Sequence, residues 1–172
     1  SERLEFNIVR SYMSAKYAYG KILDGNIAYI RLLQFGIGSY RDFIDVYQSF
    51  TYGFSGLIID LRGNGGGVLS DALDIADAFV PADQPIMWYK DKHDISSQMA
   101  TAGVKINAPV VLLVDNGSAS ASEILTAALV ENGVGVAVGN KTYGKGTVQS
   151  RRRLFDGASL YMTIAEYFTP QM

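Results

Sequence analysis

The sequence has no cysteine and a single histidine among its 172 residues. Without thiols the chain cannot carry a cysteine nucleophile, a disulfide framework or a thiolate-bound metal centre. With His93 as the only imidazole, a histidine-rich metal site is excluded, and any Ser-His-Asp triad would depend on that one residue. The absence of cysteine and the single histidine together exclude thiol chemistry and disfavour most metal sites.

The chain also lacks an excess of positive charge and a long apolar run. Fifteen Lys and Arg against 17 Asp and Glu give a net charge of −2, which disfavours nucleic acid as a partner. No segment reaches the roughly 18 apolar residues of a membrane-spanning helix, and the N-terminal SERLEFNIVR does not resemble a signal peptide. An apolar content of 48% predicts a folded chain.

The length fits one compact domain, so we expect residues 1–172 to form a single domain. Ile8 and Val9 already have strand character close to the first residue, and the chain stops at Met172 without a capping signal. Both ends indicate a domain cut from a longer chain.

Strand-like and helix-like segments alternate along most of the sequence. Apolar, β-branched runs predict strands at Asn26–Phe35, Gly56–Leu61, Pro85–Tyr89, Val110–Val114 and Val134–Val138, the last two buried. Apolar residues at helical spacing predict helices at Tyr40–Phe50, Ser70–Val80 and Ala121–Val130. This cadence predicts an α/β fold of βαβ units with a mostly parallel sheet.

Two other regions depart from the cadence. The polar stretch that follows Tyr89 up to Gly103 is predicted to be a loop. Near the C-terminus, Thr147–Phe155 and Ser159–Phe168 are strand-like and are joined by Asp156-Gly157, a strong turn signal. We expect them to form an antiparallel hairpin that completes the sheet.

The first candidate motif is Asp60–Gly67 (DLRGNGGG), between a predicted strand and a helix, where ligands gather in α/β folds. Glycines allow close backbone approach and can aim N–H groups at a phosphate or an oxyanion. Val68 and Ser70 stand where a GxGxxG dinucleotide loop needs glycine. A flexible turn without a ligand is an equally good interpretation.

The second motif is Asn116–Ile124 (NGSASASEI), which links a predicted buried strand to a helix. A serine there would present its hydroxyl at the helix N-terminus, which favours a negative oxygen. Ser120 to Glu123 also match an S-x-x-E capping box, and a capping serine needs no reactivity. Taken alone, the motif favours capping.

The third motif is Gly139–Thr147 (GNKTYGKGT), which nearly matches a phosphate-binding GxxxxGK[ST] loop. Gly146 stands where a hydroxyl should hold magnesium, and a strand-like run follows where a helix is needed. Lys145 is then either a turn lysine in water or a desolvated lysine that can serve as a neutral base.

Together the three motifs offer an oxyanion hole, a nucleophile and a base, the parts of an acyl-transfer site. In this order they also resemble DLRxNxGG, SASASE and TYGKGxVQ of the carboxyl-terminal processing peptidases, the tail-specific serine proteases of family S41. The likeness rests on Asp60–Gly67, Ser118–Glu123 and Thr142–Gln149, and runs from about Gly25 to Pro170.

The resemblance implies a role for each matching residue. Ser120 corresponds to the nucleophile, Lys145 to the general base and Gln149 to the residue that orients the lysine. In a regular strand, side chains four residues apart would be about 13 Å apart. We therefore expect a turn or one helical turn at residues 146–149, which would bring positions i and i+4 together.

The family's oxyanion hole uses the N–H of the residue after the nucleophile and that of a glycine in the glycine-rich turn. These correspond to Ala121 and, as our choice, Gly66, with Gly65 or Gly67 as alternatives. Both donors are backbone groups, so composition alone does not single out the glycine.

The resemblance further implies a crotonase-like (ClpP-like) fold and serine endopeptidase activity near protein C-termini, without metal or organic cofactor. It implies polypeptide substrates, no nucleic acid, a PDZ domain elsewhere in the full-length chain, and a cell-envelope, periplasmic or extracellular location. Residues 1–172 leave no room for that PDZ domain, and oligomer formation stays open.

Three rival interpretations stay open at this point. The same fold could bind peptides without cutting them. It could act on acyl-CoA thioesters as crotonases do, which would need a carboxylate in the site. His93 could serve Ser120 as base, although Asp91, Lys92 and Asp94 around it indicate a solvated loop.

Overall fold

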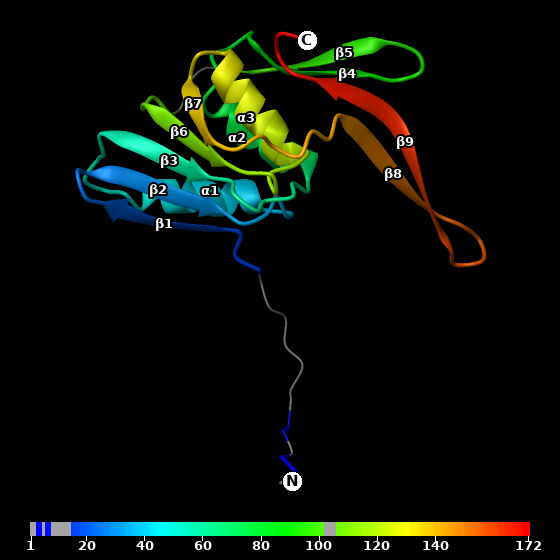
Figure 1. Ribbon diagram of the computed structural model, residues 1–172, viewed down its shortest axis with the longest axis horizontal. Helices are drawn as coiled ribbons and strands as arrows, with labels where there is room; N and C mark the ends of the chain where they lie inside the picture. Colours follow the sequence, from blue (N-terminus) through cyan, green and yellow to red (C-terminus); the bar gives the residue numbers. More distant parts are fainter. Residues whose placement is uncertain (1–2, 5, 8–14, 102–105) are drawn as a thin grey trace.

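The computed structural model describes residues 3–4, 6–7, 15–101 and 106–172, so the strand expected at Ile8 and Val9 lies outside the described residues. Within them the chain forms nine strands and three helices (Figure 1). The strands are β1 Ala18–Leu23, β2 Ile27–Leu32, β3 Gly56–Asp60, β4 Pro85–Lys90, β5 Ile95–Met99, β6 Val110–Val114, β7 Gly135–Gly139, β8 Thr147–Arg153 and β9 Ser159–Phe168. The helices are α1 Ser39–Gln48, α2 Leu69–Asp77 and α3 Ala121–Glu131.

The first sheet has the strand order β1-β2-β3-β6-β7. Strand β1 is antiparallel to β2, while the pairs β2–β3, β3–β6 and β6–β7 are parallel. The parallel register places Ile58 opposite Val111, so β3 and β6 end at the same edge of the sheet. The predicted α/β fold is confirmed, and this shared edge is where two of the three motifs begin.

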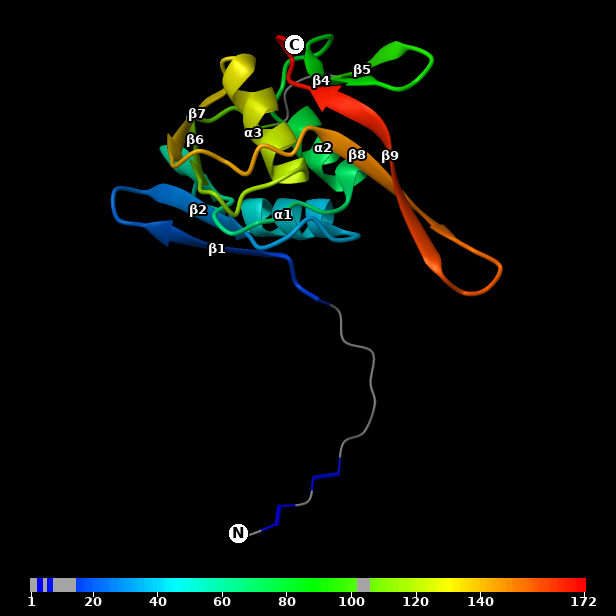
Figure 2. The same cartoon turned by 45° about the vertical axis from the view of Figure 1, so that its right-hand side comes forward.

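The three helices form one layer over this sheet, because α2 contacts both α1 and α3 (Figures 1 and 2). Strand residues alternate in direction, and Ile30, Ile59 and Leu112 are fully buried beneath the helices. Phe43 of α1 meets Phe79, just beyond α2, edge to face with ring centroids 6.1 Å apart. The apolar stripes seen in the sequence thus form one core.

The second sheet is antiparallel and has the order β5-β4-β9-β8. The hairpin of β8 and β9 belongs to it, so the expectation that this hairpin completes the parallel sheet is wrong. Strand β9 pairs with β4, with Trp88 opposite Phe168. Strand β5 occupies part of the stretch predicted to be a loop, because backbone pairing with β4 can recruit a polar segment that carries no apolar run.

Strand β7 was predicted to be buried, and that prediction is wrong. It lies at the edge of the first sheet, and Val136 and Val138 are 56% and 52% exposed. Sequence alone cannot distinguish an edge strand of valines from a central one, because burial depends on the neighbours. In the described part of the chain no helix is both long and apolar enough to cross a membrane.

Candidate active site

Two loops meet at the edge where β3 and β6 end. The Gly63 N–H donates to Asp115 Oδ1 at 2.8 Å, and the Ala119 N–H donates to the Asn64 carbonyl oxygen at 3.1 Å. Hydrogen bonds from Gly63 and from its own turn hold the pKa of the Asp115 carboxyl below its usual range. The glycine-rich turn and the serine-rich turn are therefore fixed against each other.

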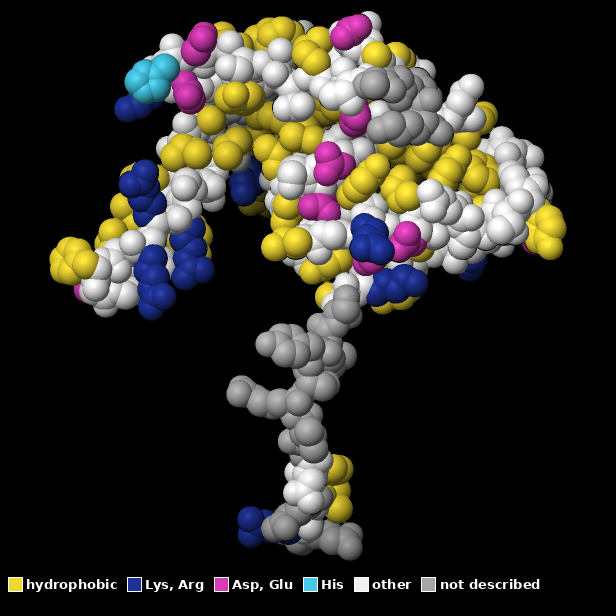
Figure 3. Space-filling view, turned by 180° about the vertical axis from the view of Figure 1, so that it is seen from behind, with side chains coloured by type: hydrophobic (Ala, Val, Ile, Leu, Met, Phe, Trp, Pro, Cys, Tyr) yellow, Lys and Arg dark blue, Asp and Glu magenta, His cyan; other side chains and the backbone are white. Residues whose placement is uncertain are grey.

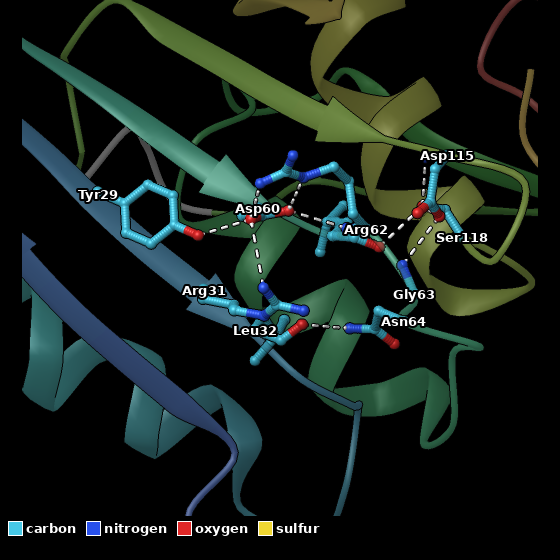
Figure 4. Close-up of polar contacts among 10 residues, drawn as sticks. Tyr29, Arg31, Leu32, Asp60, Arg62, Gly63, Asn64, Asp115 and Ser118 are labelled. Atoms are coloured by element: carbon cyan, nitrogen blue, oxygen red, sulfur yellow. Dashed lines mark hydrogen bonds and ion pairs between the residues drawn. The ribbon is translucent and has the colours of Figure 1, made fainter. Parts of the chain in front are cut away.

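Asn64 is the buried link between these loops (Figure 4). Its side-chain nitrogen donates to the Leu32 carbonyl at 2.9 Å, and its side-chain oxygen accepts the Gly66 N–H at 2.9 Å. Its own carbonyl also accepts the Ser122 hydroxyl at 2.8 Å. Asn64 thereby sets the path of the glycine turn relative to β2 through its side chain and relative to α3 through its carbonyl group.

Of the three serines in the second motif, Ser118 and Ser122 are fully buried and serve the fold. The Ser118 hydroxyl donates to the Leu61 carbonyl at 2.8 Å, as Ser122 does to Asn64. Ser120 instead occupies the N-cap of α3 with φ 55° and ψ −115°, a region that side-chain-bearing residues rarely adopt. Such local strain is typical of exposed nucleophiles at strand-to-helix turns.

Glu123 joins the turn that carries Ser120 to the loop that carries Lys145. Its Oε2 accepts the N–H of Ser120 at 2.8 Å and that of Lys145 at 3.0 Å. Its Oε1 accepts the Gly144 N–H at 2.6 Å. A single carboxylate therefore holds residues that are far apart in the sequence in a fixed relation.

The capping box expected from the sequence is present at the start of α3. The Glu123 side chain bonds the Ser120 N–H as a capping box requires. The Ser120 side chain faces the Glu123 N–H, but that N–H makes its hydrogen bond to the Ser120 carbonyl oxygen at 2.8 Å. Ser120 thus caps α3 and also lines the cavity beside it.

That cavity has a volume of about 350 Å³ and brings the predicted residues Ser120, Ala121, Lys145 and Gln149 together. Its lining comprises Gly67, Leu69, Ser120, Ala121, Ile124, Lys145, Thr147, Val148, Gln149, Arg151, Tyr161 and Tyr167. His93 lines a different cavity of about 700 Å³ and is exposed in the turn between β4 and β5. The His93–Ser120 pairing gains no support from this placement.

Gly66, our first choice for the oxyanion hole, touches Ser120 but uses its N–H elsewhere. With φ +90°, it lies so close that a Cβ there would meet the Ala119 oxygen at 2.6 Å. Its N–H donates to Asn64 Oδ1 and does not face the cavity as a free donor. The neighbouring Gly67, named above as an alternative, lines the cavity instead.

The geometry expected between Lys145 and Gln149 is also different. No helical turn forms at residues 146–149; strand β8 begins at Thr147, and a bulge lies between Val148 and Gln149. A bulge places an extra residue in one strand and turns side chains to a new direction. The extra residue here is Ile164 of β9, so β8 keeps its regular alternation, and Thr147, Gln149 and Arg151 all line the cavity that holds Lys145.

Comparisons with known proteins place this chain in a family. Residues 26–172 match the profile described as "Peptidase family S41". The chain belongs to peptidase family S41. It is 37% identical over 172 residues to the carboxyl-terminal-processing protease of Synechocystis sp., covering 97% of this chain and 40% of the relative. It is 33% identical over 168 residues to the carboxy-terminal processing protease CtpA of Bacillus subtilis, covering 96% and 36%.

Solved structures show the same fold. The photosystem II D1 C-terminal processing protease superimposes with a TM-score of 0.77 at 26% identity, covering 94% of this chain and 46% of that one. The S41 chain thus spans less than half the length of these relatives. Within the residues that the structure describes, no three His, Asp or Glu side chains gather as metal ligands would.

Sequence reasoning missed four residues that build the S41 site: Asn64, Asp115, Glu123 as a tether, and Tyr167. The Tyr167 hydroxyl is buried beside the cavity and has no hydrogen-bond partner among the described residues. Burial, together with the Glu123 carboxylate, raises the pKa of Tyr167. The Asn in DLRGN and the Glu in SASASE were visible as motif letters, but their partners are remote in sequence.

Asp60 anchors the S41 glycine turn from below (Figure 4). Its buried carboxylate accepts two bonds from the Arg62 side chain, at 2.9 and 2.7 Å, and one from the Tyr29 hydroxyl at 2.6 Å. Burial alone would raise the pKa of Asp60, but these bonds, with the Arg62 charge, outweigh it and lower the pKa to about 2. The Asp60 side chain is fully buried, whereas the side chain of its partner Arg62 is about half exposed to solvent.

Asp60→Asn is expected to lower the free energy of unfolding by about 2 kcal/mol at neutral pH. Because the folded pKa lies below the ordinary 3.8, this stabilisation is present above about pH 4 and is lost as pH falls through about 2. Urea denaturation of both proteins between pH 7 and 2 measures it. The exposed Asp24→Asn should stay within about 0.5 kcal/mol of wild type, and a pH-independent gap for Asp60→Asn would contradict the assignment.

Proposed function

We propose that this chain is the catalytic core of a serine endopeptidase that cleaves near polypeptide C-termini, with Ser120 as nucleophile and Lys145 as general base. The observation that carries the proposal is that both residues line one cavity while Glu123 holds their backbones together. The names of the relatives, which describe carboxyl-terminal processing, support the substrate class.

In this mechanism unprotonated Lys145 accepts the Ser120 proton as the hydroxyl oxygen attacks the substrate carbonyl carbon. The amide nitrogen then leaves with a proton returned by the lysine, and an acyl-enzyme on Ser120 remains. Water, deprotonated by the same lysine, attacks the ester and releases the acyl part. Gln149 orients the amine from strand β8.

For the oxyanion hole we propose the N–H groups of Ala121 and Gly67. The Ala121 N–H belongs to the first turn of α3, where helical N–H groups have no helical acceptor. Gly67 forms a parallel β-bridge with Phe35. In this bridge the Phe35 N–H donates to the Gly66 carbonyl, and the Val68 N–H donates to the Phe35 carbonyl. The central residue of such a bridge points its own N–H away from the partner strand, and Gly67 also lines the cavity.

Further properties remain part of the proposal. The parallel βαβ core fits a crotonase-like fold. A PDZ domain in the full-length chain, an envelope, periplasmic or extracellular location, and oligomer formation follow from the resemblance. An acyl-CoA enzyme is disfavoured, because the residues that line the Ser120 cavity include no Asp or Glu.

The proposed function is tested with a fluorophosphonate probe that reacts with activated serines. We expect labelling of the wild-type chain at Ser120 and none of Ser120→Ala. In a crystal structure of the adduct, the phosphoryl oxygen should lie within hydrogen-bond distance of the Ala121 and Gly67 nitrogens. A folded wild-type chain that resists the probe would favour the peptide-binding module, and an oxygen on the Gly66 nitrogen would restore our first choice.

Glu123→Gln is expected to lower kcat roughly 10- to 100-fold, with a small change in KM, because loss of one acceptor oxygen loosens the lysine loop. Steady-state hydrolysis of a peptide substrate measures both constants. The matched control is Glu131→Gln at the other end of α3, where the carboxylate bonds Gln171, and it should keep wild-type kcat. Equal kcat values for the two variants would remove Glu123 from the positioning role.

A further inference from the structure

The hairpin of β8 and β9 forms an arm that stands away from the body, with a hollow between the two (Figure 3). Lys and Arg side chains gather along this arm, where β8 contributes Arg151, Arg152 and Arg153. Of these three, only Arg151 lines the cavity that contains Ser120. Arg152 lines the cavity that contains His93, and Arg153 lines neither of the two. Arg151 is therefore placed differently from its neighbours.

The Arg151 guanidinium is held in place by the hairpin itself. Its Nε–H donates to the Ser159 hydroxyl at 3.0 Å, and its central carbon lies over the Tyr161 ring, 5.9 Å from the centroid. The Nε contact uses one of the five guanidinium donors, so the two terminal nitrogens can still meet an anion. A cation that is already oriented loses less entropy when it binds a planar carboxylate.

The cavity has an unbalanced set of charges. Its lining includes the cations Lys145 and Arg151 but no carboxylate, and in the described part of the chain Arg151 forms no ion pair. Beyond the bulge, Gln149 and Arg151 point to the same face of β8, about 6.7 Å apart along the strand. An extended peptide advances about 3.3 Å per residue. If Gln149 orients Lys145 beside the scissile bond, as proposed above, Arg151 lies about two peptide residues from that bond.

We infer that Arg151 forms a carboxylate subsite that favours substrates with a negative charge about two residues from the scissile bond. The carboxylate can be an Asp or Glu side chain or the substrate's own C-terminus. This inference rests on the proposed function only for the position of the scissile bond; the binding of a carboxylate beside Ser120 does not require catalysis.

The test compares matched peptides that carry Glu or Gln at each position near the scissile bond. Binding is measured by fluorescence anisotropy with Ser120→Ala, and hydrolysis with the intact nucleophile. We expect a three- to fivefold preference for Glu, the size of a partly exposed ion pair, and its loss at high salt. Arg151→Gln should abolish the preference, whereas Arg153→Gln, with the same change in net charge, should retain it.

A second peptide series distinguishes the source of the carboxylate. Peptides that end two residues beyond the scissile bond are compared with a free and with an amidated C-terminus. A preference for the free acid that depends on Arg151 identifies the terminal carboxylate, and a preference for Glu identifies the side chain. Either result supports the subsite.

Equal binding of every matched pair, or a preference that persists in Arg151→Gln, overturns the inference. If the neutral peptides are nevertheless hydrolysed, only the subsite is refuted, and the proposed peptidase function is retained. Conversely, Arg151-dependent binding without hydrolysis of any peptide supports the subsite and refutes the peptidase. The two proposals therefore fail in different measurements.

Discussion

Ser120→Ala is expected to lower kcat/KM for a peptide substrate by about 10⁴-fold or more, the scale on which serine peptidases lose activity with their nucleophile. The hydroxyl is the only one of the three serine hydroxyls in this turn that lines the cavity. Stopped assays at high enzyme concentration, analysed by mass spectrometry, measure the residual rate. Thermal unfolding should show a change of no more than about 1 kcal/mol, as for a lost cap.

The two neighbouring serines are the matched controls. Ser118→Ala and Ser122→Ala remove hydroxyls that bond buried carbonyls, so each should cost about 1–3 kcal/mol of stability while the folded fraction stays active. A dead but folded Ser118→Ala variant, together with an active Ser120→Ala, would show that the nucleophile is assigned to the wrong serine.

Lys145→Arg should be as inactive as Lys145→Ala, with a loss of roughly 10²–10⁴ in kcat. A guanidinium stays protonated and cannot accept the serine proton, although it keeps the positive charge. The backbone N–H that Glu123 holds is unchanged by either substitution, so the loop should keep its place. The kcat values of both variants on one neutral peptide distinguish between Lys145 as a general base and Lys145 as a positive charge only.

His93→Ala is the control for Lys145. His93 is exposed and lines a cavity that does not contain Ser120, so its loss should leave kcat near that of wild type. An active Lys145→Arg enzyme would show that charge alone matters at this position. A folded His93→Ala protein without activity would transfer the role of base to the imidazole.

The edge where Asp60–Gly67 and Ser118–Glu123 meet could be predicted from sequence, because both follow apolar runs of parallel strands. The pattern does not reveal how each donor is used. The Gly66 N–H donates a hydrogen bond to the side-chain oxygen of Asn64, two residues earlier in the chain. Gly67 lines the cavity because of the backbone conformation of the turn, in which both Gly66 and Gly67 have positive φ. Local composition cannot distinguish three consecutive glycines.

The strands β4, β8 and β9 could be predicted, but their assembly into a second sheet could not, because the pairing of β4 with β9 joins residues far apart in the sequence. Ile95–Met99 reads as polar loop and becomes a strand only through β4. The bulge at Val148 and Gln149 likewise depends on the partner strand β9. These long-range pairings determine which side chains reach Ser120 from the arm.

Strand β9 follows β8 in the sequence, and it holds the lysine loop through the Tyr167 N–H, which donates to the Gly146 carbonyl at 3.0 Å. During synthesis on the ribosome, Ser120 and its turn emerge before Lys145 and well before β9. A growing chain would thus carry its proposed nucleophile without a base or a closed cavity. Pairing of β9 with β4 and β8 completes the proposed site, so a growing chain would be unable to cut other proteins until β9 has been synthesised.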